Sequence, residues 1–398
     1  MESVLILSKW KAGGVTLAAE RLRARGLRSV CLSEVPDPRG IDRCDEHVEV
    51  DWDGEELPAL VERLERRGIV PTAVINLLEP LIPWQQAIAA HYGLPGGSAG
   101  LNVLASKTLV RERMRALGLS AMRFSGDPAK VDFFPAIVKP SRDSCASRLV
   151  RRVDSRDELL SYQQHLAERG FADTEMIVEE YLPGVEFSVD GPVLDGRFHP
   201  VLAVEKPDHD NVRHHDAGLR IHPPQQDHVR AGVRTLTGTI GALCADLNLD
   251  QLWLHVEGRA DEDGRTELVE INARFGGGMY PTVIREVSGL DPMEAVVSMS
   301  LGEFGPERLG RLHDRNLIGW VDVEADELGR VEISTTAADL CALPGILGAD
   351  VVDGYQVSDL EQENYFLRFA MTADSVDELR TRAAHVLSTV DYRITAQP

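Results

Sequence analysis

Residues 267–278 read ELVEINARFGGG, and this stretch decides the fold of the region around it. Leu268, Glu270, Asn272 and Arg274 occupy alternate positions, and the residues between them are apolar. Alternation with a period of two is typical of a β-strand, whose successive side chains point to opposite faces. The simplest interpretation is a hydrated face of an antiparallel sheet. A row of polar side chains that ends in three glycines asks for a further explanation.

A second strand, LWLHVEGRA, lies just upstream, and an Asp-Gly dipeptide at 263–264 predicts a two-residue type I′ turn between the two strands. In the resulting antiparallel register, Glu257 lies directly opposite Glu270, and His255 lies opposite Asn272. Directly opposed residues have Cβ atoms about 4.5–5.5 Å apart, and opposed like charges destabilise a sheet.

A bound divalent cation would turn this repulsion into attraction. Mg²⁺ prefers oxygen ligands and takes one or two carboxylates together with phosphates and water. We therefore predict that Glu257, Glu270 and Asn272 bind Mg²⁺ (or Mn²⁺). Two carboxylates on a hydrated face are the alternative.

The composition restricts the possible partners. The chain has 398 residues and a formal net charge of −22 at pH 7. Nucleic acids and anionic membranes bind clustered Lys and Arg, so we expect neither as a partner. Five scattered cysteines without a CxxC motif predict reduced thiols. The N-terminus does not resemble a signal peptide and no apolar run reaches membrane-spanning length, so we expect a cytoplasmic protein.

Lysine is rare in this chain. Only six of the 42 basic residues are lysines, so arginine supplies most of the positive charge. A retained lysine is then somewhat more often a position that needs a compact ammonium group. This argument singles out Lys107, Lys139 and Lys206.

The order of the predicted elements divides the chain into three parts. In residues 1–100, strands alternate with amphipathic helices, which predicts a doubly wound α/β domain with a parallel sheet. Residues 101–305 begin with a helix from 101 to about 124 and continue as an α+β region. Residues 306–398 form a β-rich domain. The segment 205–224 carries four histidines whose spacing does not favour zinc, and we interpret it as a loop over the active site or a surface loop.

The two paired strands and the glycine run resemble the metal-binding core of the ATP-grasp superfamily. Three further stretches resemble this superfamily in the same order, namely ASKTLVRERM, FPAIVKP and MIVEEYLPGVEFSVD. The resemblance covers about residues 101–305. It implies an N-terminal domain of the pre-ATP-grasp type, a central ATP-grasp core of two subdomains and a C-terminal β-rich domain.

The resemblance also implies roles for individual residues. Lys107 and Lys139 would contact phosphates, and Lys206 would point into the nucleotide pocket. Glu179 would accept a hydrogen bond from the adenine amino group, and Glu186 would bind the ribose hydroxyls. The complete set of implied ATP contacts is Lys107, Lys139, Ser147, Glu179, Glu180, Tyr181, Leu182, Glu186 and Lys206.

The same resemblance implies that Arg274 is catalytic and contacts the transferred phosphate or the acyl oxygen of the substrate. The amides of the glycine run, including Gly277 and Gly278, would hold a substrate carboxylate, although this run can also be a simple turn. One departure is the loop 141–149, SRDSCASRL, which lacks the glycines usual in the family. Ser144 and Ser147 could donate hydroxyl groups to phosphate there, and Arg148 could add charge.

The layout is similar to that of L-amino-acid ligases (dipeptide synthetases). It implies an ADP-forming ligase that uses ATP and Mg²⁺ to join an amino acid, or a similar carboxylate, to an amine through an acyl phosphate. A purine-biosynthetic enzyme or a biotin-carboxylase-type enzyme has a similar layout. A catalytically inactive nucleotide-binding regulator is the alternative of another class. The expected partners are small-molecule carboxylate and amine substrates, and a homodimer is left open.

Overall fold

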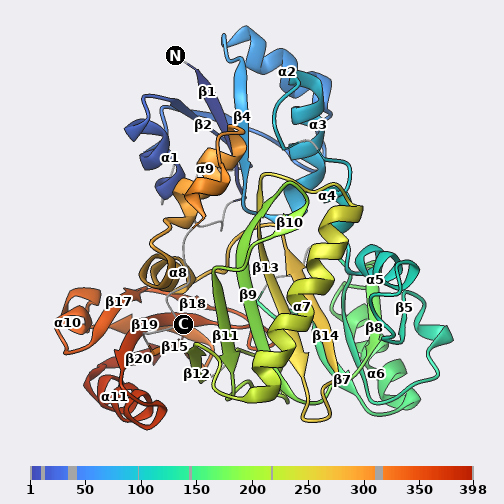
Figure 1. Cartoon of the computed structure of the whole chain (residues 1–398), viewed down its shortest axis with the longest axis vertical. Helices are drawn as coiled ribbons and strands as arrows, with labels where there is room; N and C mark the ends of the chain where they lie inside the picture. Colours follow the sequence, from blue (N-terminus) through green and yellow to red (C-terminus); the bar gives the residue numbers. More distant parts are fainter. Residues whose placement is uncertain are drawn as a thin grey trace.

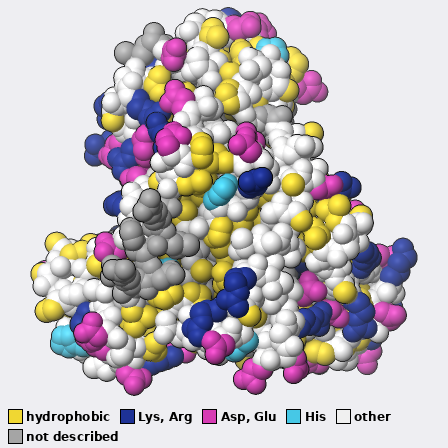
Figure 2. All heavy atoms as spheres, viewed as in Figure 1, with side chains coloured by type: hydrophobic (Ala, Val, Ile, Leu, Met, Phe, Trp, Pro, Cys, Tyr) yellow, Lys and Arg dark blue, Asp and Glu magenta, His cyan; other side chains and the backbone are white. Residues whose placement is uncertain are grey.

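The computed structural model describes residues 2–9, 14–34, 43–96, 98–142, 146–216, 218–309 and 317–396. Ser144, a predicted hydroxyl donor to phosphate, lies outside these ranges. The described residues form four β-sheets, and Figure 1 shows the N-terminal sheet at the top of the molecule with the other sheets below it. On the face shown in Figure 2, acidic and basic side chains are interspersed around apolar ones.

The N-terminal part is the predicted parallel α/β structure. Its four strands have the order β3-β2-β1-β4 and are parallel. Every residue of β1 is buried, as is typical of a parallel sheet covered on both faces. The elements are β1 (Ser3–Leu7), α1 (Val15–Ala24), β2 (Arg28–Ser33), β3 (Glu46–Glu49), α2 (Leu57–Arg66), β4 (Pro71–Asn76), η2 (Glu79–Leu81) and α3 (Ile82–Tyr92).

The helix predicted from 101 to about 124 is two shorter helices, α4 (Leu101–Leu104) and α5 (Lys107–Ala116). The break occurs at Ser106, whose hydroxyl accepts a hydrogen bond from the amide of Leu109 (3.3 Å) and caps α5. The N–H group of Lys107 instead donates to the carbonyl of Ser141 (2.8 Å). The start of α5 is thereby fixed beside the second predicted phosphate-binding segment.

A small antiparallel sheet follows, with the order β5-β8-β6-β7. Its strands are β5 (Phe124–Ser125), β6 (Ala136–Pro140), β7 (Arg151–Val153) and β8 (Met176–Glu180). The helices η3 (Pro128–Lys130) and α6 (Arg156–Glu168) lie between these strands in the chain. Helix α6 packs its apolar face, including Leu159 and Leu166, against Val138 and Val178 of the sheet.

The large sheet has the order β14-β13-β9-β11-β12-β15-β19-β17, with β10 beside β9. Helix α7 (Asp227–Asp246) lies across β9, β13 and β14 (Figure 1), and Leu236 and Ile240 of this helix pack against Val189 and Val256. The strands are β9 (Val185–Leu194), β10 (Arg197–Phe198), β11 (Leu202–Lys206), β12 (Leu219–His222), β13 (Leu252–Ala260), β14 (Thr266–Asn272), β15 (Leu317–Glu324), β17 (Ile346–Val351) and β19 (Tyr365–Ala373).

The large sheet extends across residue 305, where the sequence analysis placed a domain boundary. Strand β12 pairs with β15 in an antiparallel register, so three C-terminal strands belong to the same sheet as the central ones. The remaining elements are α8 (Tyr280–Ser288), α9 (Pro292–Ser300), η4 (Pro306–Arg308), β16 (Gly329–Ile333), α10 (Ala337–Cys341), β18 (Gln356–Val357), α11 (Val376–Thr389) and β20 (Tyr392–Thr395). In the described ranges, none of the helices combines the length and apolarity needed to cross a bilayer.

The segment 359–363 connects the C-terminal part to the small sheet. Arg169 of the small-sheet region pairs with Asp359 (2.8 Å) and with Glu361. The N–H group of Glu363 donates to the carbonyl of Ala146 (3.0 Å), and the Glu363 carboxylate accepts from the Ser147 hydroxyl (3.4 Å). Glu363 therefore holds Ala146 and Ser147, which belong to the glycine-poor loop.

Glu363 makes this contact sensitive to pH. Burial and the nearby Asp216 carboxylate raise the pKa of Glu363 from 4.5 to about 7, against the opposing effects of Arg220 and Tyr365. The folded protein therefore retains a proton that the unfolded chain loses at a lower pH. The stability that this proton contributes is complete below about pH 4.5 and is lost as the pH rises through about 7.

We expect Glu363→Gln to remove this pH dependence of stability, because glutamine accepts the same hydrogen bonds and stays neutral at every pH. The difference in Tm between the variant and the wild type should shift in favour of the variant between about pH 5 and pH 8. Thermal unfolding across this range measures the effect. Glu327→Gln, an exposed position just before β16, is the control and should not change the pH profile. Parallel profiles for Glu363→Gln and the wild type would contradict the assignment.

Candidate active site

The hairpin β13–β14 carries the predicted metal ligands. Glu257 pairs with Glu270 and His255 with Asn272, as predicted. The predicted two-residue turn is wrong, because the last strand pair joins residues 260 and 266 and leaves a five-residue turn. A β-bulge between Glu257 and Gly258 shifts the register by one residue and restores the expected pairing beyond it.

The bulge also changes which side chains face the core. Leu268 packs in the same apolar cluster as Ile271, whereas Val269 lines a cavity. The simple alternation of Leu268 with Glu270 is therefore wrong at this point. A bulge leaves the extra residue without a partner on the neighbouring strand. The carbonyl of Val269 is thereby available and accepts a hydrogen bond from Lys139 Nζ (2.8 Å).

Lys139 belongs to a buried cluster with Glu179 and Arg111. The carboxylate of Glu179 contacts Arg111 Nε (2.6 Å) through one oxygen and Lys139 Nζ (2.8 Å) through the other. Burial alone would raise the pKa of Glu179, but the two cations lower it to about 2. Both carboxylate oxygens are therefore engaged by protein cations, which differs from the adenine contact expected for Glu179.

The contact of Arg111 with Glu179 was not predicted from the sequence. Its Nη2 also donates to the carbonyl of Leu268 (2.7 Å), so it connects α5 to the bulged strand. Arg111 stands four residues after Lys107, which places both side chains on the same face of the helix. The four-residue spacing from Lys107 could have identified Arg111 as a candidate site residue.

The two opposed carboxylates are each compensated by a lysine. Lys107 Nζ lies 3.1 Å from Glu270, and Lys206 Nζ lies 2.5 Å from Glu257. Both carboxylates and Asn272 line the cavity. Two carboxylates and an amide oxygen on one face form a set of donors that fits Mg²⁺.

Lys206 is surrounded by carboxylates rather than directed into open space. Its ammonium group contacts Glu186 (3.1 Å) and Asp216 (2.9 Å) in addition to Glu257. Burial opposes the charge of Lys206, but the three carboxylates raise its pKa well above the usual range. Among the described residues, Glu186, His209 and Asp216 are close enough to share a metal ion. Because Lys206 already contacts two of them, we interpret this group as an ion-pair network.

His255 connects this network to the strand β9. Burial would lower the pKa of His255, but Asp190 and Glu257 raise it to about 9, so the imidazole is charged at neutral pH. Nδ1 then donates to Asp190 (2.7 Å), and Nε2 faces Glu257 (3.4 Å). Asp190 also accepts from the amide of Gly276 (2.9 Å). One buried carboxylate thus contacts both strand β13 and the glycine turn.

Arg274 is held by the N-terminal part of the chain. Its Nε lies 3.2 Å from Glu79 of η2, and its Nη1 donates to the carbonyl of Phe275 (3.1 Å). The turn after it contains Gly278 with φ of 59°, a left-handed conformation that favours glycine. Strand β14 has already ended at residue 272, so Arg274 and the glycines lie in a loop at the end of the hairpin.

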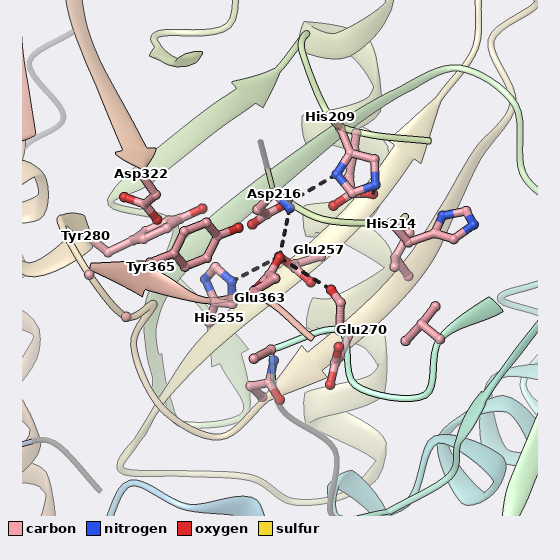
Figure 3. Close-up of a pocket in the computed structure, with 18 of the residues that line it drawn as sticks. His209, His214, Asp216, His255, Glu257, Glu270, Tyr280, Asp322, Glu363 and Tyr365 are labelled. Atoms are coloured by element: carbon pink, nitrogen blue, oxygen red, sulfur yellow. Dashed lines mark hydrogen bonds and ion pairs between the residues drawn. The ribbon is translucent and has the colours of Figure 1, made fainter. Parts of the chain in front are cut away.

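These residues surround a cavity of about 790 Å³. Figure 3 shows Glu257 and Glu270 in it, with His255, Asp216 and Glu363 nearby. Of the residues that the sequence analysis proposed, those that line the cavity are Lys107, Lys139, Ser147, Glu179, Glu180, Tyr181, Leu182, Glu186, Glu257, Glu270, Asn272, Arg274, Gly277 and Gly278. Lys206 does not line the cavity itself, but its ammonium group contacts Glu186, Asp216 and Glu257 of this wall.

The hinge segment, residues 179–182, has an uneven distribution of charge. The Glu180 side chain pairs with Arg123 (3.0 Å) and with Arg265, at the rim. The ring of Tyr181 contacts two guanidinium groups, those of Arg152 (4.4 Å) and Arg259 (5.6 Å). Tyr181 and Arg259 both line the cavity, so an aromatic ring and a cation lie together on this wall.

The histidine-bearing segment is divided between the cavity and the protein interior. His209 and His214 line the cavity, and Figure 3 shows both. His215 pairs with Glu324 (2.8 Å), and His222 contacts the carbonyl of Ala203 (2.8 Å). Burial lowers the pKa of His214 to about 4. His214 is therefore neutral at physiological pH.

Several residues of the wall come from the C-terminal part of the chain and had no sequence signal. They include Asp322, Tyr355, Tyr365 and Arg368. Each lies on or beside a strand that reads as an ordinary β-segment, so only the three-dimensional structure reveals their position.

Comparisons with known proteins agree with this geometry. Residues 132–282 match the family described as the ATP-grasp domain. The dapdiamide A synthase of Enterobacter agglomerans is 25% identical over 241 residues, which cover 58% of this chain and 54% of that protein. The chain thus matches about half the length of this curated relative.

Two solved structures are similar over nearly the whole chain. The L-amino acid ligase from Bacillus licheniformis has a TM-score of 0.80 at 20% identity and covers 100% of this chain and 99% of its own. The biotin carboxylase domain of the Hydrogenobacter thermophilus 2-oxoglutarate carboxylase has a TM-score of 0.71 at 14% identity, covering 99% and 91%. Residues 132–282 therefore match the ATP-grasp domain, and the whole chain has the fold of the L-amino acid ligase and of the biotin carboxylase domain.

Proposed function

We propose that the protein is an ATP-dependent, ADP-forming ligase that joins the carboxylate of an amino acid, or a similar acid, to an amine. The observation that carries this proposal is the opposition of Glu257 and Glu270 on the cavity wall, with Lys139 and Arg274 beside them. The relatives support it, because one is an L-amino acid ligase and another a dapdiamide A synthase.

In the first step, a carboxylate oxygen of the substrate attacks the γ-phosphorus of ATP, and the bond to the bridging oxygen of ADP breaks. Lys107 and Lys139 bind the phosphates, and Glu179 with Arg111 orients Lys139. The hinge at Glu180, Tyr181 and Leu182 accommodates the adenine. Charge on the transferred group is offset by preorganised cations, which require no reorganisation during the reaction.

In the second step, the amine nitrogen attacks the acyl carbon, phosphate leaves with the carbon–oxygen electron pair, and the amine loses a proton. Arg274 stabilises the oxygen on which charge develops. The amides of Gly277 and Gly278 hold the substrate carboxylate. Glu257, Glu270 and Asn272 would hold Mg²⁺ (or Mn²⁺), which would neutralise phosphate charge, and a related biotin carboxylase domain binds MgADP.

A biotin-carboxylase-type reaction is the second candidate, because that domain shares the fold and binds bicarbonate. The direct test is ADP release with a panel of L-amino acids, singly and in pairs, with product identification by mass spectrometry. A new amide product in a pair supports the ligase. Bicarbonate-dependent ADP release without an amide product supports the second candidate. Nucleotide binding without any ADP release supports an inactive regulator.

The metal assignment predicts the effect of Glu270→Gln. The variant removes a charged ligand while it preserves the size of the side chain. Changes to groups that only support a metal ligand typically cost about 10–100-fold, so we expect ADP release to fall by at least about 100-fold. Glu262→Gln, in the exposed turn of the same hairpin, is the matched control. Near-normal ADP release by Glu270→Gln at saturating Mg²⁺ would refute the assignment.

The cluster around Lys139 predicts that lysine cannot be replaced by arginine. The ammonium group fits between the carbonyl of Val269 and Glu179, whereas a planar guanidinium is wider. We expect Lys139→Arg to weaken ATP binding by about 10-fold or more, as measured by calorimetry. The exposed Lys130→Arg is the control and should bind ATP like the wild type. Unchanged affinity in Lys139→Arg would show that the identity of this residue is unimportant.

The position of Arg274 predicts a loss of rate without a loss of nucleotide binding. Removing one preorganised donor to a developing charge costs on the order of 10²–10³ in rate. Arg274→Ala should lower kcat for amide formation by this factor, while ADP affinity, measured on the same preparation, changes little. If nucleotide affinity falls and the remaining enzyme has a normal rate, Arg274 belongs to the nucleotide site instead.

A further inference from the structure

Glu363, just before β19, is a half-buried carboxylate on the cavity wall that the two proposed steps do not use. Every other carboxylate that lines the cavity forms an ion pair with a lysine or an arginine. Within the described ranges no basic side chain forms an ion pair with Glu363, which accepts from neutral groups, the N–H of Asp216 (2.8 Å) and the hydroxyl of Ser147 (3.4 Å). Buried carboxylates are normally paired with a cation, so this position suits a cation that a ligand supplies.

Glu363 lies between two parts of the proposed phosphate site, and Figure 3 shows it near Glu257. On one side it accepts a hydrogen bond from Ser147, an expected phosphate contact. On the other side its partner Asp216 shares the ammonium group of Lys206 with Glu257, an expected metal ligand. The acyl phosphate would form between these two parts. Glu363 therefore lies on the part of the wall that the second substrate must approach.

The groups that face Glu363 give it the proton affinity of a base. Burial and the Asp216 carboxylate raise its pKa to about 7, against the opposing effects of Arg220 and Tyr365. Asp216 itself differs, because Lys206 and Arg220 outweigh the effect of burial and lower its pKa well below the usual range. A general base is most effective when its pKa lies near the working pH. Glu363 meets this condition.

The histidines of the cavity wall are less suited to accept a proton. Despite their burial, His209 and His255 have a raised pKa because of neighbouring carboxylates, which favours the forms that already hold a proton. Burial lowers the pKa of His214 to about 4, so its imidazole is a weak base.

We propose that Glu363 is the general base that removes a proton from the attacking amine. This proposal rests on the proposed function and deepens it, because it assigns a residue to the proton transfer of the second step. The amine enters as an ammonium group, which the unpaired carboxylate attracts. Glu363 takes one proton, and the electrons of the broken N–H bond become the lone pair that forms the C–N bond. The carbon–oxygen bond to phosphate breaks, the departing phosphate takes the second proton, and the amide keeps the third.

The test compares two acceptors that differ in their need for a base. One acceptor is the L-amino acid of the panel that gives the most amide, whose amino group is protonated at neutral pH. The other is hydroxylamine, which is mostly unprotonated at neutral pH and traps the same acyl phosphate as a hydroxamate. Both products are measured with the same donor acid at pH 7.

Glu363→Gln keeps the hydrogen-bond acceptor but cannot take up a proton. General bases typically contribute about 10²–10⁴ in rate, so kcat/KM for the amino-acid acceptor should fall by about 100-fold or more. Hydroxamate formation and ADP affinity, measured by calorimetry, should stay within about threefold of the wild type. The exposed Glu327→Gln is the control and should use both acceptors like the wild type.

The wild type supplies a second readout that needs no variant. At saturating substrates, kcat for amide formation should fall as the pH decreases below about 7, because protonated Glu363 cannot accept a proton. The kcat for hydroxamate formation should lack this fall. If Glu363→Gln does not fold, the comparison of these two pH profiles decides.

Two results with Glu363→Gln would overturn the proposal while the ligase function stands. An equal loss of amide and hydroxamate would make Glu363 a support of the loop at Ser147, and unchanged amide formation would exclude it as the base. Identical pH profiles for the two acceptors in the wild type would also overturn it. Absence of both products from the wild type with every donor would overturn the ligase proposal itself, and this proposal with it.

Discussion

The opposition of Glu257 and Glu270 is the constraint on which the rest of the site depends. Two carboxylates on directly paired strands repel each other, so the fold must supply positive charge from outside the hairpin. It does so from two directions, with Lys107 on α5 and Lys206 on β11. The same charges that allow the hairpin to fold therefore connect the small-sheet region and the large sheet around one cavity. A cation and a polyphosphate would enter a site whose charges are already arranged for them.

The bulge in β14 is the second determinant of this geometry. At the bulge in the edge strand β14, the carbonyls of Leu268 and Val269 accept hydrogen bonds from Arg111 and Lys139. Backbone carbonyls have little freedom to move, so they fix the position of Lys139 more firmly than side chains alone. A local irregularity in one strand thus helps to define where the ammonium group of Lys139 lies.

The sequence predicted the parallel N-terminal sheet and the strand pair that carries Glu257 and Glu270, because both depend on local periodicity. The turn was predicted incorrectly, and the pairing was nevertheless right because the bulge compensated for the longer turn. Arg111 was missed although its spacing from Lys107 was informative. Asp190 could not be predicted, since a single acidic residue in an apolar strand carries no pattern that reveals its contact with the distant glycine turn. Contacts between distant segments are decided by the register of the whole sheet.

The continuity of the large sheet brings C-terminal side chains to the cavity. Because β12 pairs with β15, the C-terminal strands β15 and β19 belong to the same sheet as the strands that carry Glu257 and Glu270. An L-amino acid ligase and a biotin carboxylase domain that binds bicarbonate share this architecture, so the architecture alone does not select the acid. Selection must then come from side chains on the wall beside the glycine turn. In this chain β15 and β19 contribute Asp322, Tyr365 and Arg368 to that wall.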